Sequence, residues 1–370
     1  MMLRDAKWVV VVDGQEGQEC ELFGDGSLSF SPDSRRLAYA AMRDGKWRVV
    51  VDGKESPLFD GIGTNNCLFS PNSERFAYAA TNGGKWLVIV DGKQGRPYDR
   101  VAKGLCFSPD SQHVAFMAER GGKRMVVVDG KEEPPLNPVG RVVFSPDSQR
   151  VAYVAKRGAK EFMVLDGKEG KEYGGIGDLV FSPDSRKVAY AASAKPDGEE
   201  GMVVVDGEEG PVFEGIQADV RFSPNSQRVL YVAKRGAKAL VVLDGKEGPE
   251  VDYFGDGALC FSADSRRVAY AAECGGKWRV VVDGQEGAEY DRLGPGVPEF
   301  SPDSRHVVYE ATRGRKQRIV VDRKESQEYE FVSPLVFDGP KRIRFWATRY
   351  DESFSREMLL VEIEIVEEKP

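Results

Sequence analysis

The sequence predicts an all-β protein, and more narrowly a single closed β-propeller of about nine four-stranded blades. Two observations lead to this fold class. One short motif returns along the whole chain at intervals of 37 to 41 residues, and no stretch of useful length shows the 3.6-residue periodicity of a helix. Four short strands in a repeat of about 40 residues form a propeller blade.

The recurring motif is Phe-Ser-Pro-Asp-Ser. Asn replaces its Asp at Asn72 and Asn225, and Ala263 replaces its Pro. A degenerate last copy begins at Phe337. The other copies begin at Phe30, Phe69, Phe107, Phe144, Phe181, Phe222, Phe261 and Phe300. So regular a series indicates tandem copies of one structural unit.

The residues around each motif predict the strands of the unit in order. The first strand ends in the motif, as in Leu28-Ser29-Phe30, because the following Pro cannot donate to a strand ladder. Asp-Ser then makes a turn. The second strand alternates, as in residues 37–41, and a Gly-containing loop at residues 43–46 follows it. The third strand, as in residues 49–51, is continuously β-branched, which is typical of a strand covered on both faces.

An Asp-Gly pair follows the third strand in eight copies, from Asp13-Gly14 to Asp283-Gly284, and the ninth reads Asp322-Arg323. Asp-Gly between two strands predicts a tight hairpin, because Gly adopts a positive φ at little cost. A short fourth strand ends in an aromatic residue such as Phe59 or Tyr98, and a linker leads into the next unit.

The two ends of the chain predict how the ring closes. A third-strand pattern at residues 8–12 precedes the first motif, and another at residues 358–365 follows the last. We therefore expect one domain over residues 1–370, with nine blades and N-terminal strands that complete the blade begun by the C-terminus. Eight blades are the alternative, and the sequence leaves open which terminal strand closes the ring.

The composition of the chain argues against several classes of function. Lys plus Arg number 52 against 60 Asp plus Glu, which argues against a nucleic-acid or anionic-membrane binder because such proteins carry a basic excess. No apolar run is long enough to cross a bilayer. The five cysteines include no Cys-x-x-Cys pair, and the N-terminus has no signal-peptide pattern. We expect a cytoplasmic monomer, or a periplasmic or secreted one if a signal peptide was removed.

The motif, followed by a short polar stretch and an apolar-Ala-Tyr strand such as Leu37-Ala38-Tyr39, resembles the WD40-like repeat of TolB-type β-propellers. The resemblance covers nearly the whole chain. Two features depart from it: Ser stands where Gly usually follows the motif Asp, and the Gly-His and Trp-Asp signatures of true WD40 repeats are absent. The resemblance implies a scaffold that binds a protein or peptide on one face of the disc.

Signals of catalysis are weak, so we expect no enzyme and no cofactor. The two histidines, His113 and His306, occupy a column that holds Arg or Lys in other repeats, which predicts solvent-facing substitutes for a cation. There is no Gly-x-Ser-x-Gly elbow and no calcium-loop pattern. Cys67, Cys106 and Cys260 lie among apolar residues, which predicts buried, inert thiols.

One face of the disc carries the candidate partner site. Because strands alternate in direction, the loops between second and third strands share a face with the linkers between blades. Just before the third strand stands a column of lysines, and the next column varies from Trp to Arg, Glu, Gly, Ala and Gln. Trp beside a cation is the composition of an interaction hot spot. The hypothesis is an arc that binds a protein or peptide, formed by Lys7, Trp8, Lys46, Trp47, Lys85 and Trp86.

Two other readings remain. A small ligand or metal ion in the central channel would need convergent polar side chains on the inner strands, where only Arg221 and Glu299 replace small or apolar residues. A gating propeller would need a separate hydrolase chain, because the repeats fill the sequence.

Overall fold

The computed structural model describes residues 2–4, 7–24, 27–102, 104–196, 198–294, 298–350 and 356–365. Every regular element in these ranges is a β-strand, which confirms the predicted all-β class. The chain divides into two compact units. Unit 1 comprises Met1–Phe181 and Val188–Gly198, and unit 2 comprises Ser182–Lys187 and Glu199–Pro370. The expectation of one domain over residues 1–370 stays a prediction.

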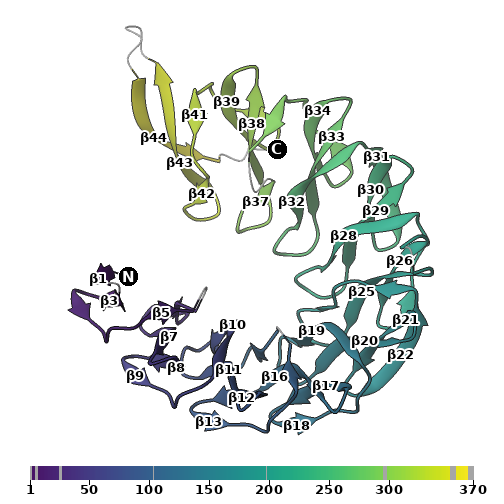
Figure 1. Cartoon of the computed structure of the whole chain (residues 1–370). Helices are drawn as coiled ribbons and strands as arrows, with labels where there is room; N and C mark the ends of the chain where they lie inside the picture. Colours follow the sequence, from purple (N-terminus) through teal and green to yellow (C-terminus); the bar gives the residue numbers. More distant parts are fainter. Residues whose placement is uncertain are drawn as a thin grey trace. The chain divides into compact units, whose positions relative to one another are not determined.

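Unit 1 begins with two small hairpins, in which β1 (Met2–Arg4) pairs with β2 (Lys7–Val9) and β3 (Val11–Val12) pairs with β4 (Gln15–Glu16). Three sheets follow along the chain (Figure 1). The first contains β5 (Leu22–Phe23), β6 (Ser29–Phe30), β7 (Leu37–Arg43), β8 (Lys46–Val51) and β9 (Lys54–Glu55). The second contains β10 (Gly61–Phe69), β11 (Phe76–Asn82), β12 (Lys85–Val90) and β13 (Lys93–Gln94). The third contains β14 (Arg100–Val101), β15 (Cys106–Phe107), β16 (Val114–Arg120), β17 (Lys123–Val128) and β18 (Lys131–Glu132).

The remaining strands of unit 1 continue the same series. A fourth sheet contains β19 (Pro138–Phe144), β20 (Val151–Arg157), β21 (Lys160–Leu165) and β22 (Lys168–Tyr173). The last strands of the unit are β23 (Gly175–Ile176), β24 (Val180–Phe181) and β25 (Val188–Ser193).

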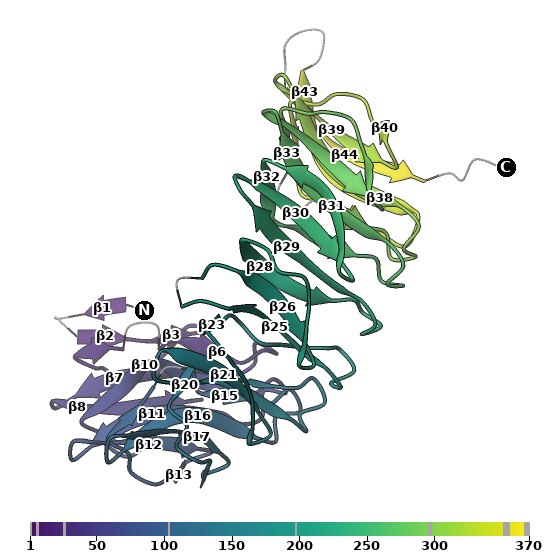
Figure 2. The ribbon, with the colours of Figure 1, turned by 90° about the vertical axis from the view of Figure 1, so that its right-hand side faces the viewer.

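Unit 2 repeats the arrangement (Figure 2). It begins with the paired strands β26 (Gly201–Val205) and β27 (Glu208–Glu209). Two four-stranded sheets contain β28 (Gly215–Phe222), β29 (Val229–Arg235), β30 (Lys238–Leu243), β31 (Lys246–Val251), β32 (Tyr253–Phe261), β33 (Val268–Cys274), β34 (Lys277–Val282) and β35 (Gln285–Glu286). The last two sheets contain β36 (Arg292–Leu293), β37 (Glu299–Phe300), β38 (Val307–Arg313), β39 (Lys316–Val321), β40 (Lys324–Glu325), β41 (Phe331–Val332), β42 (Val336–Phe337), β43 (Arg342–Tyr350) and β44 (Arg356–Glu364).

The repeat folds as the predicted four-stranded antiparallel meander, which is the architecture of a propeller blade. One feature differs from the sequence prediction. The first strand is interrupted in several repeats, as between β5 and β6 or β14 and β15. Even the continuous β10 shifts register between Ile62 and Cys67, which face Ala80 and Tyr78 of β11. The first strand therefore carries more residues than its partner strand, and the excess leaves the ladder.

The predicted Asp-Gly hairpins are confirmed by the backbone. Asp52 and Gly53 have φ values of 50° and 78°, the two positive angles that a type I′ turn needs. Asp322 and Arg323 keep this geometry at 46° and 74° although Gly is missing. The turn shape therefore belongs to the repeat, and Gly makes it easier to adopt.

Consecutive sheets pack face to face through the second- and third-strand side chains. In one such cluster of unit 1, Val88 of β12 packs with Phe116 of β16 and Val127 of β17, and all three are buried. The ring of Tyr98 meets that of Phe116 edge to face at 5.8 Å. At the ends of the chain, β1 to β4 and β41 to β44 are paired within their own units, so closure of a nine-bladed ring stays a prediction.

Candidate partner-binding groove

The loops between second and third strands lie beside the linkers between blades, as the strand directions predict. A single carboxylate ties them together. The Oδ1 atom of Asp99 accepts a hydrogen bond from Lys85 Nζ at 2.5 Å, and its Oδ2 atom accepts one from the Gly121 N–H of the next blade at 2.6 Å. The hydrogen bond from Lys85 is the main reason that the pKa of Asp99 is lowered. We call this arrangement the carboxylate clamp.

The carboxylate clamp recurs in both units. Each copy joins a Lys, an Asp fourteen residues later and the turn glycine of the following blade. The other copies are Lys46–Asp60–Gly83, Lys238–Asp252–Gly275 and Lys277–Asp291–Gly314. Four lysines of the column that the sequence singled out, Lys46, Lys85, Lys238 and Lys277, are thus explained by contacts within the chain.

The three lysines of the hypothetical arc are all ion-paired. Lys46 and Lys85 belong to carboxylate clamps, and Lys7 Nζ lies 3.4 Å from Glu19 Oε2. Their side chains remain about half exposed, and the ion pairs fix where the ammonium groups point. Binding of a partner by these lysines stays a prediction.

The tryptophans of the arc are half-buried and share one backbone arrangement. Trp8, Trp47 and Trp86 each exchange two backbone hydrogen bonds with a fourth-strand residue, at 2.8 to 2.9 Å. The ring of Trp8 packs edge to face on Phe23 at 6.3 Å. Trp86 packs against the buried cluster around Phe116. The side chains of Trp8 and Trp86 therefore contribute to packing between blades, and of the three tryptophans only Trp86 lines the groove described next.

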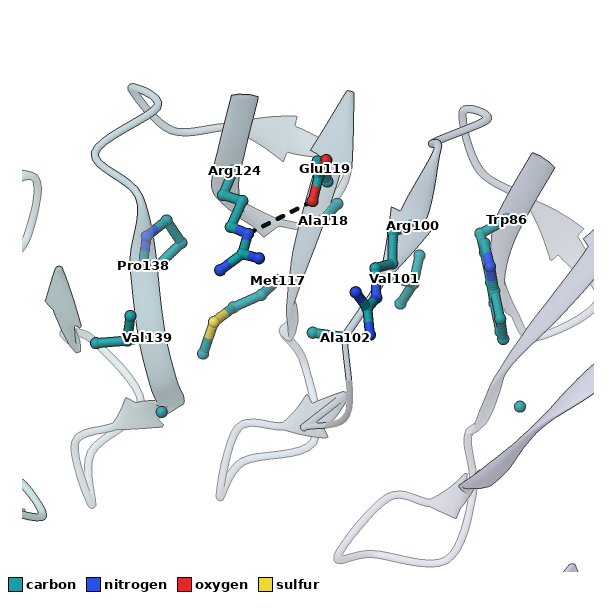
Figure 3. Close-up of a pocket in the computed structure, with 12 residues that line it drawn as sticks. Trp86, Arg100, Val101, Ala102, Met117, Ala118, Glu119, Arg124, Pro138 and Val139 are labelled. Atoms are coloured by element: carbon teal, nitrogen blue, oxygen red, sulfur yellow. Dashed lines mark hydrogen bonds and ion pairs between the residues drawn. The ribbon is translucent and has the colours of Figure 1, made fainter. Parts of the chain in front are cut away.

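A groove of about 530 Å³ opens on this face of unit 1 (Figure 3). Its lining comes from β10, β12, β14, β16, β17 and β19, so three successive blades build it. The lining residues are Gly63, Trp86, Arg100, Val101, Ala102, Met117, Ala118, Glu119, Arg124, Pro138, Val139 and Gly140. Because Met117 lies in its middle in Figure 3, we call it the Met117 groove. Most of its floor is apolar, which suits an apolar side chain of a ligand.

Three charged residues border the Met117 groove. Arg124 Nε lies 3.4 Å from Glu119 Oε2, and both side chains reach solvent. Arg100 is exposed and forms no ion pair within the part of the chain that the structure describes. In Figure 3, Arg124 lies above Met117 and Arg100 lies to its right. The border therefore carries a net positive charge above an apolar floor.

Sequence reasoning found Trp86 and missed the rest of the groove. Arg124 stands in the same column as Trp86, and that column was noted for its variability. Arg100, Met117 and Val139 occupy three different columns of the repeat, and only packing of successive blades brings them together. One feature of the sequence could have pointed to the groove: Met117 is larger than Ala40 and Ala79, which occupy its column in the preceding repeats.

The opposite edge of each blade carries the Phe-Ser-Pro-Asp-Ser turn, and its contacts explain the motif. In one turn, Ser108 Oγ donates to the carboxylate of Asp110. The second serine, Ser111, accepts a hydrogen bond from Asn72 N–H of the preceding blade at 3.0 Å. Arg75 donates to Asp91 Oδ2 at 2.8 Å and lies over the Phe107 ring at 5.3 Å. The motif is therefore a joint between neighbouring blades.

Both histidines replace the arginine of this joint. His113 Nδ1 lies 2.6 Å from Asp129 Oδ2, and His306 Nδ1 lies 2.5 Å from Asp322 Oδ2. The predicted exposure holds in part for His113, whose side chain is 40% exposed, and is wrong for His306, of which 9% is accessible. His306 belongs to the last joint, where it lines a crevice together with Ile319 and Ile365.

The two proposed channel residues lie in unit 2. The Arg221 guanidinium donates to the Leu259 carbonyl at 2.6 Å, which joins two inner strands. Glu299 is exposed, and the protein around its carboxyl group raises its pKa. Cys260 lies near both charges, and burial raises its pKa to about 11. Binding of a ligand by Arg221 and Glu299 stays a prediction.

Two further thiols, those of Cys67 and Cys106, behave similarly. Burial raises the pKa of Cys67 to about 12 and that of Cys106 to about 11, so neither thiol ionises near neutral pH. Among the described residues, no group of three or more His, Cys, Asp or Glu side chains is placed to hold a metal ion. A search of the same residues finds no helix that is long and apolar enough to cross a membrane.

Comparisons with known proteins concern the fold alone. No family model matches the sequence, and no curated protein matches it. Similar solved structures include a eukaryotic initiation factor, with 14% identity over 91% of this chain and 96% of that chain and a TM-score of 0.41. TolB from Acinetobacter baumannii has 18% identity over 58% and 62% of the two chains, with a TM-score of 0.31. The β-propeller domain of the Trilobed protease from Pyrococcus furiosus has 11% identity over 84% and 97%, with a TM-score of 0.33.

Proposed function

We propose that this protein is a non-catalytic β-propeller scaffold that binds a protein or peptide partner on the face of the loops between second and third strands. The partner places an apolar side chain in the Met117 groove. The proposal includes a closed ring of nine blades, in which the N-terminal strands complete the last one.

The Met117 groove is the observation that carries this proposal. Crevices on the opposite edge recur at equivalent positions, as beside Asp91 in unit 1 and Asp283 in unit 2, and so belong to the repeat. The Met117 groove combines Trp86 with Met117 and Arg124, and the preceding repeats have Ala in the column of Met117 and Trp in that of Arg124. Aromatic and arginine side chains around an apolar floor are typical of sites where a partner is anchored.

A matched pair of arginine variants tests the proposal. Arg100 and Arg292 each follow the clamp Asp of their repeat, and both are exposed. Arg292 lies outside the residues that line the Met117 groove. Arg100→Gln should weaken binding of peptides about tenfold, the loss expected for a charged hydrogen bond, and Arg292→Gln should not.

The measurement is selection of a phage-displayed random-peptide library on the immobilised wild-type protein, followed by affinities of the enriched peptides. Circular dichroism melts confirm that each variant folds. Failure of the wild type to enrich any peptide, or equal weakening by both variants, contradicts binding at this groove.

Tryptophan variants distinguish binding at the Met117 groove from binding along the wider arc. Trp47 and Trp86 have equivalent backbone bonds and similar burial, but only Trp86 lines the groove. Trp47→Ala and Trp86→Ala should therefore lower the melting temperature alike, while only Trp86→Ala weakens peptide binding. Loss of binding in Trp47→Ala would favour the wider arc.

A further inference from the structure

The carboxylate clamp is interrupted beside the Met117 groove. Lys123 stands where Lys46 and Lys85 stand in the preceding repeats, but the residue fourteen positions later is Asn137, between Leu136 and Pro138. Lys123 is exposed and forms no ion pair within the described ranges. Gly158, which corresponds to Gly121, is an exposed residue, and no acceptor for its N–H is found among the described residues. The chain therefore presents an ammonium group and an N–H without the carboxylate that joins them elsewhere.

This interrupted clamp adjoins the Met117 groove through the backbone on both sides. Lys123 directly precedes Arg124, and Asn137 directly precedes Pro138; Arg124 and Pro138 both line the groove. Arg100, Lys123 and Arg124 bring three positive charges to this region, and Glu119 brings one negative charge. The missing carboxylate and the charge excess both call for an anionic ligand group.

We propose that the partner supplies the missing carboxylate. An Asp or Glu side chain of a peptide accepts hydrogen bonds from Lys123 Nζ and Gly158 N–H, as Asp99 does from Lys85 and Gly121. An apolar residue next to it in the peptide occupies the Met117 groove. The inference rests on the proposed function and specifies its partner as a peptide segment in which an acidic residue adjoins an apolar one.

Four copies of the clamp in this chain support the chemistry. In each, one carboxylate bridges a lysine and a backbone N–H, and hydrogen bonding to the lysine lowers the pKa of Asp60, Asp99, Asp252 and Asp291. A carboxylate is thus the group that this pair of donors binds when one is within reach. At Lys123 the donors are exposed, so a ligand can reach them.

Two lysine variants form the test, because they stand in one column and differ only in their partner. The wild type, Lys123→Gln and Lys85→Gln are each used to select the same phage-displayed random-peptide library, and the enriched sequences are compared. The wild type and Lys85→Gln should enrich peptides with Asp or Glu beside an apolar residue. Lys123→Gln should lose the acidic preference and bind the wild-type peptides at least about tenfold more weakly.

Asn137→Asp provides a second, independent variant. The Asn137 side chain lies 3.5 Å from the Lys156 carbonyl, two residues before Gly158. An aspartate there supplies a carboxylate from within the chain, so it should compete with the acidic peptide and weaken its binding at least about tenfold. The variant loses the hydrogen bond that the Asn137 amide donates to the Lys156 carbonyl and gains an exposed pair with Lys123, so its melting temperature should stay close to that of the wild type.

The outcomes separate this inference from the proposed function. Peptides that carry no acidic preference, or that bind equally well to Lys123→Gln, overturn the inference while peptide binding by the scaffold stands. A wild-type protein that enriches no peptide overturns both. If Lys85→Gln and Lys123→Gln lose peptide affinity equally, the inference is also overturned, because binding then depends on the overall positive charge and not on Lys123 in particular.

Discussion

The two edges of the blades differ in how strictly they repeat. On the motif edge, the serine and arginine contacts recur with little change, and even His113 and His306 keep a close contact between Nδ1 and the hairpin aspartate. On the loop edge, the carboxylate clamp recurs in both units, but no carboxylate stands fourteen residues after Lys123 or after Lys160, where the chain has Asn137 and Gly174. Contacts that are kept in successive repeats hold the blades together, while a departure beside a groove marks a surface that is available to a partner.

Acid should affect both edges and produces the largest expected effect. The Ser108 hydroxyl lowers the pKa of Asp110 on the motif edge, and Lys85 lowers that of Asp99 on the loop edge. A carboxylate with a lower pKa in the folded state stabilises the fold fully above its unfolded value of about 4, and this stabilisation is lost as the pH falls through the folded value.

Thermal melts followed by circular dichroism should therefore show a constant midpoint from about pH 7 to 5 and a steep fall below about pH 4. Adding salt at neutral pH distinguishes the edges, because screening weakens the exposed lysine pairs of the loop edge more than the hydroxyl contacts of the motif edge. A midpoint that is unchanged at low pH would contradict these roles of the carboxylates.

Removal of one motif-edge contact should have the next largest effect. Ser111 is fully buried, and its hydroxyl accepts the Asn72 N–H of the preceding blade. Ser111→Ala leaves that N–H unpaired, so the free energy of unfolding should fall by about 1–3 kcal/mol in urea titrations.

Ser111→Gly serves as the control for Ser111→Ala. The φ of Ser111 is 67°, a positive angle that Gly adopts more easily than Ala. Both variants lose the hydroxyl, so any extra loss in Ser111→Ala measures backbone strain. If both variants have the same free energy of unfolding as the wild type, the hydroxyl of the motif serine does not hold neighbouring blades together.

Restoring the consensus at His113 should give a smaller gain. Arg75 in the same column also donates to the Ser111 and Gln112 carbonyls of the next blade, at 3.0 and 2.5 Å. His113→Arg should gain such bonds and stabilise the protein by about 0.5–1.5 kcal/mol. His113→Lys keeps a charge without the planar group and should gain less. Equal gains would show that charge alone matters at this joint.

The loop-edge lysines should give the smallest change in stability. Lys85→Gln loses an exposed ion pair with Asp99, whereas Lys123→Gln loses none among the described contacts. The melting temperature should fall slightly for the first and stay unchanged for the second, because exposed pairs contribute little. A larger fall for Lys123→Gln would show that its ammonium group already has a structural partner, and the comparison of the two edges would fail.

Much of the fold was predictable because its signals are short-range. The Pro and Asp-Gly positions mark strand ends and hairpins through backbone geometry, and Asp52 and Gly53 have the predicted angles. The break in the first strand was harder to predict, because it depends on how many residues of β10 the partner β11 can match. Of the predicted site, Trp86 lies in the groove, while Lys46 and Lys85 are held in ion pairs.

The sequence by itself determined the repeat, the strand order within it and the edge on which each loop lies, because these follow from periodicity and alternating strand direction. Only the tertiary structure showed what the columns do. It showed that the second serine of the motif accepts a hydrogen bond from the preceding blade. It also showed that Lys85 is paired with a carboxylate while Lys123 has no such partner among the described residues, and that Arg100, Met117 and Val139 line one groove. Contacts between blades depend on how one sheet packs on the next, and such packing joins residues that no local pattern relates.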